Sequence, residues 1–458
     1  MKKILVILLS IFVLGQSSAA LAASPPREKL NLKAHPSYQI DAKYDSKENM
    51  LKGHLKVKFK NRYKKNLKEV RFNVWSNAKE YQDQGGSVTI TNMKSNHEPV
   101  NFKLENSVLQ VFTRPQALNK VVEIEFSFNI TVPENNDRYG RTDKIVKLGN
   151  ALPVLAVYDS EGWNTDPFYE YGDSFFAEAS EYNVSFLTEK SMKVVSSGSE
   201  TNYYYKNEYT LHTFKAKQAR DFSLVLSKDF LKQTLPLKNH VINVYYLPEQ
   251  QSQLNLIKQT TRDSFELFEK TFGKYPWKEF DVALTDGWFG GMEFSQFVMV
   301  SLYDGLSEED LKFNVAHEIA HQWFYAIVGS NQHDEPWLDE ALASYAALLY
   351  KNDTNNLTAG PVEDPYYKLT STVTDFMNKG DEGINNYYYM TYIYGTTALY
   401  DLRLLVGDKP FYQTLKQYIR ENQYKIATTQ EFIKLFERKN KLDLSEYMNE
   451  HRITPESN

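Results

Sequence analysis

Apolar and polar residues alternate in many short runs between about residue 36 and residue 230. The run Leu55–Lys60 alternates without a break, as does Val122–Phe128, and Tyr182–Phe186 follows more loosely. Successive side chains of a strand point to opposite faces, so this period is typical of strands with one buried and one solvated face. Clusters of Asn, Gly and Asp separate the runs, as turns do. The pattern predicts an antiparallel β domain, which we place at residues 30–235.

The pattern changes near residue 235. An apolar run at 240–246 predicts one more strand, and 250–272 has helical spacing that ends at Gly273 and Pro276. A strand over 280–284 then leads into a glycine-rich stretch, and the chain after 307 is mostly helical in pattern. Residues 236–450 therefore predict a second domain, built from a small mixed sheet plus helices.

A capping box opens one of the late helices. In Thr428-Thr429-Gln430-Glu431 the first and last side chains can each satisfy a backbone N–H of the other. The whole chain, at 458 residues, is too long for one ordinary core. We expect an α+β protein of two domains.

The first 23 residues have the pattern of a secretory signal peptide. Lys2 and Lys3 precede an apolar stretch at 4–14 that is too short to span a bilayer, and Ala20-Leu21-Ala22 is a cleavage pattern. The alternative is an uncleaved anchor. We therefore expect a secreted or cell-envelope protein.

Charge and cysteine content narrow the chemistry. The net charge of −5 becomes −5 − 2 = −7 without the two signal lysines, and no basic tract predicts a nucleic-acid partner. With no Cys, disulfides and thiol catalysis are excluded. Only His and carboxylate side chains remain as strong zinc ligands.

One motif carries metal chemistry. His317-Glu318-Ile319-Ala320-His321 places two imidazoles four residues apart, on one face of a helix, and Glu340 follows 19 residues after His321. Three protein ligands leave one zinc position open, as catalytic sites require, and Glu318 is free to act as a base. A surface helix with two unrelated His is the alternative. The apolar residues around the motif favour a buried helix, where such polar groups need a partner.

These residues stand within a longer resemblance. The chain resembles the aminopeptidase N-type zinc metallopeptidases of the gluzincin clan, with His317–Phe324 followed by Trp337-Leu338-Asp339-Glu340. Gly290-Gly291-Met292-Glu293 is similar to the family's exopeptidase motif, and Tyr392-Ile393-Tyr394-Gly395 to its catalytic tyrosine motif. The resemblance implies an N-terminal β saddle or sandwich and a thermolysin-like catalytic domain.

The resemblance also implies roles for these side chains. One Zn²⁺ is bound by His317, His321 and Glu340, with Glu318 as general base. Tyr392 stabilises the oxyanion, and Glu293 binds the free α-ammonium of the substrate. The predicted substrate-binding segment comprises Gly290, Gly291, Met292 and Glu293. Two positions depart from the family pattern: Phe294 replaces an Asn and Tyr394 replaces a Lys, and either change could alter substrate preference.

Several assignments stay open. Asp339 and Ser344 are candidates to support a metal-bound His. A second residue on the α-amine, which the family often adds, could be Glu161, Glu170 or Glu178. We expect His333 and Asp334 to be exposed loop residues rather than a second metal site.

Three functions compete. The leading prediction is an exported zinc aminopeptidase acting on peptides with a free N-terminus, with no nucleic-acid partner and no membrane contact beyond a possible uncleaved signal. A thermolysin-like endopeptidase would share the metal chemistry but would not need Glu293. A non-catalytic peptide-binding scaffold would be expected to have lost a ligand, the base or Tyr392, and all five residues are present.

Overall fold

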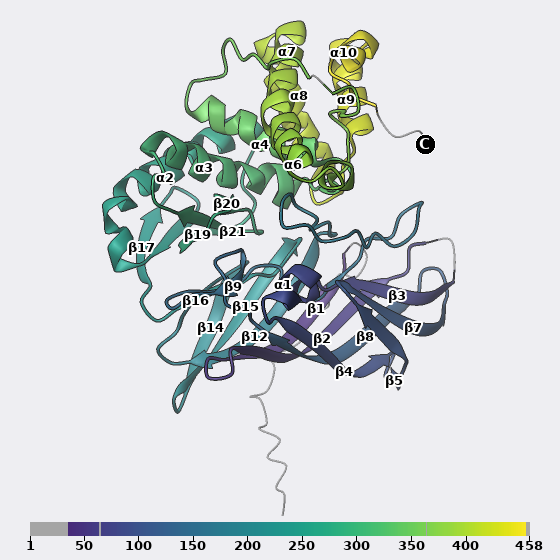
Figure 1. Ribbon diagram of the computed structural model, residues 1–458, viewed down its shortest axis with the longest axis vertical. Helices are drawn as coiled ribbons and strands as arrows, with labels where there is room; N and C mark the ends of the chain where they lie inside the picture. The colour runs from purple at the N-terminus through teal and green to yellow at the C-terminus, as the bar shows by residue number, and fades with distance from the viewer. Residues whose placement is uncertain (1–34, 64–65, 363, 455–458) are drawn as a thin grey trace, which may run out of the picture. The chain divides into compact units, whose positions relative to one another are not determined.

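The alternating runs build one large sheet. The computed structural model describes residues 35–63, 66–362 and 364–454, so the signal peptide predicted at 1–23 lies outside the described residues. Eight strands form the sheet, in the spatial order β14 (Ser199–Lys206), β15 (Tyr209–Ala219), β12 (Ser180–Glu189), β1 (Ser37–Asp45), β2 (Met50–Lys60), β8 (Val121–Thr131), β4 (Ser87–Ser95) and β5 (Glu98–Pro99) (Figure 1). Only β1 and β12 pair in parallel within it. In β2, apolar side chains are buried while the lysines between them are partly exposed, which is the predicted alternation.

Two smaller sheets complete the β domain. One has the order β13 (Lys193–Ser196), β16 (Leu224–Ser227), β10 (Val146–Leu148) and β9 (Tyr139–Arg141). The other has the order β11 (Val154–Leu155), β3 (Leu67–Asn73), β7 (Val108–Gln116) and β6 (Phe102–Glu105). Two short helices, η1 (Trp75–Asn77) and α1 (Lys79–Asp83), follow β3.

A five-stranded sheet begins the second half. Its order is β17 (Leu231–Pro236), β18 (Val241–Tyr246), β19 (Glu279–Asp286), β21 (Phe297–Leu302) and β20 (Gly291–Met292). Strands β18, β19 and β21 run parallel, and β17 and β20 close the two edges antiparallel. Phe297 and Met299 of β21 belong to the core of the β domain, whereas Val298 and Val300 belong to the core beneath the helices. Burial on both faces explains the continuous apolar run of β21.

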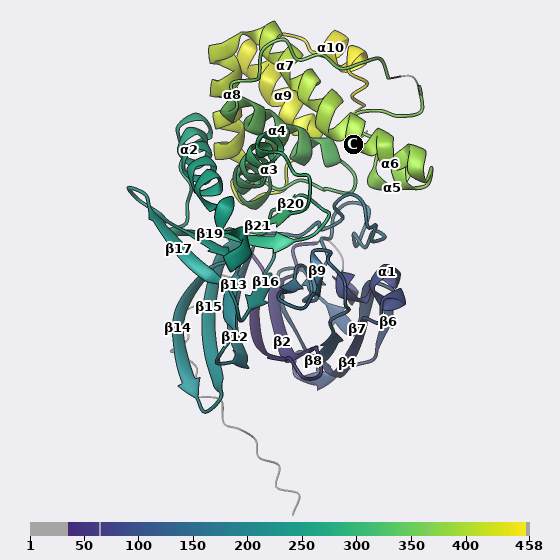
Figure 2. The same ribbon diagram turned by 60° about the vertical axis from the view of Figure 1, so that its left-hand side comes forward.

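Helices follow this sheet (Figure 2). They are η2 (Pro248–Ser252), α2 (Leu254–Phe272), α3 (Glu308–His321), the π-helical η3 (Gln322–Ile327), α4 (Pro336–Tyr350), α5 (Val373–Met377), α6 (Asp381–Tyr388), the π-helical η4 (Tyr389–Tyr394), α7 (Gly395–Val406), α8 (Asp408–Asn422), α9 (Thr429–Asn440) and α10 (Ser445–Glu450). The predicted capping box of α9 is present, with Thr428 and Glu431 each bonded to the other's backbone N–H. The predicted α+β class, a multi-sheet β domain followed by a helical region, is confirmed.

A buried arginine fastens segments that are far apart in the sequence. The Arg220 guanidinium donates to the carbonyl oxygens of Ala177 at 3.1 Å, Tyr325 at 2.5 Å and Lys425 at 2.8 Å. A Cβ on Gly329 would lie 2.2 Å from the guanidinium carbon, so the absence of a side chain there makes room for the arginine. These hydrogen bonds connect the β domain to the helical region near the site described below.

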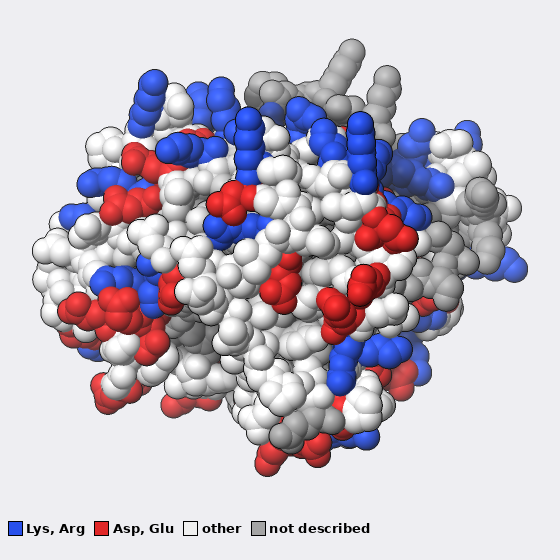
Figure 3. Space-filling model, turned by 90° about the horizontal axis from the view of Figure 1, so that it is seen from above, with Lys and Arg blue, Asp and Glu red and all other residues white. Residues whose placement is uncertain are grey.

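The surface carries charges of both signs. On the face of the described residues in Figure 3, acidic and basic side chains lie interspersed among uncharged ones. None of the helices in the described ranges combines the length and apolarity that a membrane span requires. The predicted absence of a nucleic-acid partner stays a prediction.

Candidate active site

Helices α3 and α4 bring the three predicted metal ligands together. His317 Nε2 lies 3.1 Å from Glu340 Oε2 and 3.0 Å from His321 Nε2, and His321 Nε2 lies 3.5 Å from Glu340 Oε2. Zinc bonds of about 2.0–2.2 Å set at tetrahedral angles need ligand atoms roughly 3.3–3.5 Å apart, close to these values. Two imidazoles and one carboxylate are a donor set typical of catalytic zinc. The residues therefore fit the metal that the sequence predicts.

Local structure explains this placement. Ser307 caps α3 by accepting from the Asp310 N–H at 3.1 Å. The second half of the helix, from residue 315 to residue 321, is buried and carries both imidazoles. Pro336 occupies the first turn of α4, where a missing N–H costs nothing, and Glu340 follows one turn later. Both ligand-bearing segments are therefore helical.

The two imidazoles are held from behind. Asp339 Oδ1 lies 2.7 Å from His321 Nδ1, and Ser344 Oγ lies 3.3 Å from His317 Nδ1. Each contact uses the ring nitrogen that the metal would not use, and so directs the other nitrogen toward the centre. Each of the two candidate supporting residues from the sequence therefore contacts one of the two predicted His ligands.

Charges in this centre are strongly coupled. Burial lowers the pKa of His321, but the negative charges of Asp339 and Glu293 outweigh burial and hold this pKa well above its usual range. Burial would likewise raise the pKa of Glu340, but hydrogen bonds from His317 and His321 bring it well below its ordinary value. Glu340 is therefore held as a carboxylate, the form that binds metal.

Glu318 points into the same space. Its Oε2 is buried without a hydrogen-bond partner among the described residues, as a base awaiting a water molecule would be. Burial raises the pKa of this carboxyl to about 8. A Cβ on Gly291 would lie 2.3 Å from Glu318 Oε1, so only glycine lets β20 approach Glu318 this closely.

The predicted substrate-binding segment lies on an edge strand. Gly291 and Met292 form β20, which pairs on one side with β21, and Gly290 has a φ of 73° that favours glycine. The side chain of Met292 is buried in the core, with Sδ 3.4 Å from Nη1 of Arg138. Any contact between Met292 and a substrate therefore belongs to its backbone.

Glu293 follows β20 and is buried. Gln332 donates from Nε2 to Glu293 Oε1 at 3.0 Å and to Asp339 Oδ2 at 2.6 Å. Burial, with Asp173 adding negative charge nearby, raises the pKa of Glu293 well above its usual value. An arriving ammonium would favour the ionised form. Gln332, which sequence reasoning missed, joins the support of the metal ligand to the predicted amine site.

Tyr392 lies on the π-helical turn η4 and its ring stacks on His317, with ring centroids 5.7 Å apart. Single π-helical turns occur often at functional sites because they redirect side chains. Among the neighbouring tyrosines, the hydroxyls of Tyr389 and Tyr394 donate hydrogen bonds to the backbone carbonyls of Gly360 and Glu450, respectively. The structure thus separates Tyr392 from these two packing residues. The Tyr387 hydroxyl is also buried, without a partner in the described residues.

One of the two departures from the family pattern is a core residue. Phe294 is fully buried and stacks on Phe297, with centroids 5.4 Å apart, so it fills the core rather than lining a substrate pocket. Gln322 holds the backbone on both sides of this position by donating to the Phe294 carbonyl and accepting from the Gln296 N–H.

A further carboxylate faces the centre from the β domain. Asp173 is ion-paired with the buried Arg138, and burial raises its pKa to about 6, with Arg138 opposing and Glu340 adding to the rise. Of the glutamates suggested from the sequence, Glu170 contributes its backbone carbonyl, which accepts from Arg138 Nη2 at 3.3 Å, and Glu178 lies 4.0 Å from Arg62. The neighbouring Gly172 has a φ of 83°, and a Cβ there would lie 3.2 Å from Tyr387 Cζ.

The expectation for His333 is wrong. Its side chain is buried, because Nδ1 contacts Asp334 Oδ1 at 2.7 Å and Nε2 contacts Thr374 Oγ1 at 2.8 Å. Sequence reasoning treated the segment between the two ligand helices as a solvated loop. The approach of α5, which is remote in sequence, covers it.

Comparisons with known proteins agree with this geometry. Residues 258–451 match the Peptidase family M1 domain. Aminopeptidase RNPEPL1 of Homo sapiens is 27% identical over 187 residues, which are 37% of this chain and 26% of that protein. Probable aminopeptidase 2 of Sulfurisphaera tokodaii is 22% identical over 375 residues, 75% of this chain and 46% of that protein. The matched part of the chain thus spans less than half the length of these relatives.

A solved structure shares the fold. The M1 zinc metallopeptidase from Deinococcus radiodurans superposes with a TM-score of 0.68 at 17% identity, covering 92% of this chain and 95% of that one.

Proposed function

We propose that this chain, whose residues 258–451 match the Peptidase family M1 domain, is a zinc-dependent aminopeptidase that removes N-terminal residues from peptides. One observation carries the proposal: the ligand atoms of His317, His321 and Glu340 converge beside a Glu318 carboxylate oxygen that has no partner in the described structure. A scaffold without activity has no need for an unsatisfied buried carboxylate, which costs about 1–3 kcal/mol or more.

His317, His321 and Glu340 would hold one zinc ion at this centre. Zinc, when bound, supplies a Lewis acid that makes water more acidic and polarises the scissile carbonyl. Asp339 and Ser344 fix the imidazole orientations through the contacts described above.

Glu318 performs the proton transfers in the proposed reaction. Its carboxylate accepts a proton from the attacking water and later delivers it to the nitrogen of the departing amine, so the base is regenerated. Gly291 allows this carboxylate to lie against the edge strand along which the peptide would run. The Tyr392 hydroxyl donates a hydrogen bond to the oxygen that becomes negative, which is worth a few kcal/mol, about 2.7–4, in comparable sites.

Glu293 favours the aminopeptidase over the endopeptidase. A buried carboxylate that a neutral amide side chain, Gln332, holds in place can accept charge-assisted hydrogen bonds from a free α-ammonium. An internal peptide nitrogen is uncharged and would leave Glu293 buried without a counter-charge. Asp173 is our candidate for the β-domain residue that assists, in place of the three glutamates considered from the sequence.

Export remains part of the proposal. The support for it is the signal-like pattern of residues 1–23. Expression of the full chain in a secreting bacterial host should yield protein outside the cytoplasm, with a mature N-terminus near Ala23. Recovery of only the cytoplasmic, full-length chain would contradict export.

The test of the activity is hydrolysis of aminoacyl fluorogenic amides, each supplied with a free and an N-acetylated α-amine. We expect cleavage of free forms only, abolished by Glu318→Gln and strongly weakened, mainly in KM, by Glu293→Gln. The control is Glu308→Gln, which removes an exposed carboxylate from the first turn of α3 and should change nothing.

Two results would contradict the proposal. Cleavage of acetylated internal peptides that Glu293→Gln leaves unchanged would indicate an endopeptidase. Failure of zinc-loaded wild type to cleave any peptide would favour the binding scaffold.

A further inference from the structure

Three side chains outside the active site converge in the way that metal ligands do. Asp166 comes from the β domain, and His333 and Asp334 come from the segment between η3 and α4. His333 Nδ1 lies 2.7 Å from Asp334 Oδ1 and 3.6 Å from Asp166 Oδ1, and one ligand atom of each residue lies within 4.8 Å of the others. Metal bonds of about 2.1 Å at angles between octahedral and tetrahedral place ligand atoms roughly 3.0–3.4 Å apart. The two distances from His333 Nδ1, 2.7 Å and 3.6 Å, lie just below and just above that range.

The charge of this cluster is unbalanced. Both carboxylates make their ion pairs with the same imidazole, and in the described part of the chain no Lys or Arg nitrogen comes within 4.0 Å of either. An imidazole carries at most one positive charge, against two negative charges. Asp166 is partly buried, so solvent compensates this repulsion less than it would at an open surface. A divalent cation would balance the cluster.

The imidazole is held as a metal-bound imidazole usually is. His333 Nε2 contacts Thr374 Oγ1 at 2.8 Å, and Thr374 Oγ1 contacts the Tyr169 hydroxyl at 3.0 Å. This fixed contact on one ring nitrogen directs Nδ1 toward the two carboxylates. Metal-binding His residues commonly have such an anchored second nitrogen, and His321 shows the same division of roles in the active site.

The second carboxylate is positioned independently. Asn331 donates from Nδ2 to Asp334 Oδ2 at 2.6 Å, which leaves Oδ1 facing His333. The His333 carbonyl also accepts from the Val373 N–H at 2.8 Å, so the backbone of this segment is fastened to the start of α5. The two proposed metal ligands of this segment, His333 and Asp334, are therefore held in place by hydrogen bonds to neighbouring residues.

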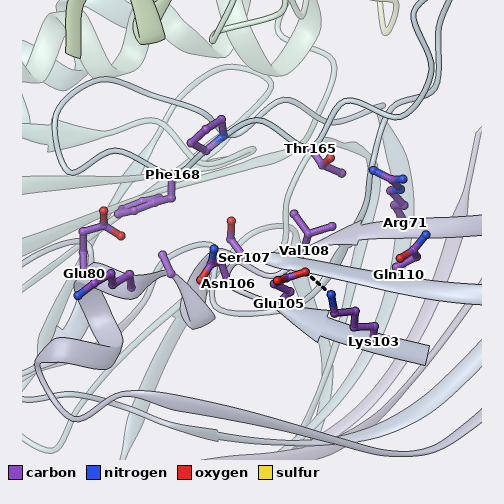
Figure 4. Close-up of a pocket in the computed structure, with 13 residues that line it drawn as sticks. Arg71, Glu80, Lys103, Glu105, Asn106, Ser107, Val108, Gln110, Thr165 and Phe168 are labelled. Carbon is purple, nitrogen blue, oxygen red and sulfur yellow. Dashed lines mark hydrogen bonds and ion pairs between the residues drawn. The ribbon is translucent and has the colours of Figure 1, made fainter. Parts of the chain in front are cut away.

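Solvent reaches the Asp166 loop. Its chain neighbours Thr165 and Pro167 line an open cavity of about 540 Å³ in the β domain, where Arg71, Glu80, Lys103 and Glu105 also lie (Figure 4). The Lys103 and Glu105 side chains pair with each other there. The cavity thus borders the chain on either side of Asp166.

We propose that Asp166, His333 and Asp334 form a second metal site, which binds a divalent first-row transition metal such as Mn²⁺ or Zn²⁺. The imidazole favours these ions over Ca²⁺ or Mg²⁺, which prefer oxygen ligands. The ion would join the β domain to the segment that leads directly into α4, at Pro336, and so brace the helix that carries Glu340. Its role is structural, and it does not depend on the proposed peptidase activity.

The test is a metal count on the full chain, stripped with a chelator, reloaded with Mn²⁺ or Zn²⁺ and desalted. Wild type should hold two ions, one in the catalytic centre and one in the second site. The His321→Ala variant lacks a catalytic ligand, so it should hold only the ion of the second site. Adding Asp166→Asn to His321→Ala should abolish this remaining ion, and adding Asp334→Asn should do the same.

The matched control is Glu161→Gln in the His321→Ala background. Glu161 lies in the same loop as Asp166, but its side chain is exposed and makes no contact with the cluster in the described structure, so this variant should keep the ion. The melting temperature gives a second readout: Mn²⁺ should raise it in His321→Ala and not in the Asp166→Asn double variant. Circular dichroism of the metal-free proteins verifies folding.

Either of two results would overturn the inference. One is a His321→Ala protein that retains no ion and shows no shift in melting temperature with Mn²⁺ or Zn²⁺. The other is an ion that persists unchanged in both the Asp166→Asn and the Asp334→Asn double variants. If Ca²⁺ alone shifted the melting temperature, the assignment to a transition metal would be wrong.

Discussion

Replacement of Asp339 by Asn tests whether the contact behind His321 determines metal affinity. In the native protein, the two Asp339 oxygens accept from two donors, His321 Nδ1 at 2.7 Å and Gln332 Nε2 at 2.6 Å. An amide offers one oxygen and one donor, so one of these two hydrogen bonds must be lost. All three side chains are buried, and water does not easily replace the lost partner.

The expected magnitude follows from that lost bond. A hydrogen bond to a charged group contributes about 1.5–3 kcal/mol. At 1.4 kcal/mol per factor of ten, this corresponds to zinc affinity weakened roughly 10–100-fold, the range typical of residues that support a metal ligand. The Ser344 contact with His317 is neutral and longer, at 3.3 Å. Ser344→Ala should therefore cost only about 0.5–1.5 kcal/mol, at most roughly tenfold.

Zinc affinity is measured by competition with a chelator of known affinity, with metal content and restored hydrolysis read on the same samples. Activity at saturating zinc then separates lost affinity from lost chemistry. Equal affinities for wild type and Asp339→Asn would refute the reasoning, and so would a larger loss in Ser344→Ala than in Asp339→Asn.

Three other predictions concern the site and its scaffold. Gly291→Ala should lower kcat at least about tenfold, because a Cβ 2.3 Å from Glu318 Oε1 must displace that carboxylate; an unchanged kcat in steady-state hydrolysis would show that Glu318 does not need this position. Tyr392→Phe should lower kcat by about 10²–10³ with little change in KM, and a loss confined to KM would assign the hydroxyl to binding. Asp281→Asn should stabilise the protein at alkaline pH. Burial raises the pKa of Asp281 to about 8. The neutral form of Asp281 therefore stabilises the wild-type protein fully below about pH 4, and this contribution is lost as the pH rises through 8. The gain, on the order of a few kcal/mol, is measured by urea unfolding at pH 5 and pH 8.5, and equal gains at both pH values would contradict it.

The site couples metal support to amine recognition through one side chain. Gln332 donates to both Glu293 and Asp339, so the predicted ammonium site and the support of His321 share a donor. Neither Gln332 nor Asp173 is part of a motif with fixed spacing. Both became visible only when the fold placed them beside the residues that the sequence had identified.

The sequence alone determined the elements whose causes are local. The period of two gave the strands of the eight-stranded sheet, and the Thr428–Glu431 capping box gave the start of α9. The ligand pair on α3 was also readable, because a four-residue spacing places two side chains on one helix face whatever lies around the helix. Asp339 and Ser344 were candidates because they lie directly before Glu340 and four residues after it in the sequence.

Tertiary structure alone decided what depends on segments remote in sequence. His333 was expected in solvent and is buried, since α5 packs against it from beyond residue 370. Phe294, which departs from the family pattern, is buried in the core because Phe297 of β21 stacks on it. Asp166 and Asp173 reach the catalytic half from a β-domain loop, and periodicity within a segment contains no information about which distant segment it will meet.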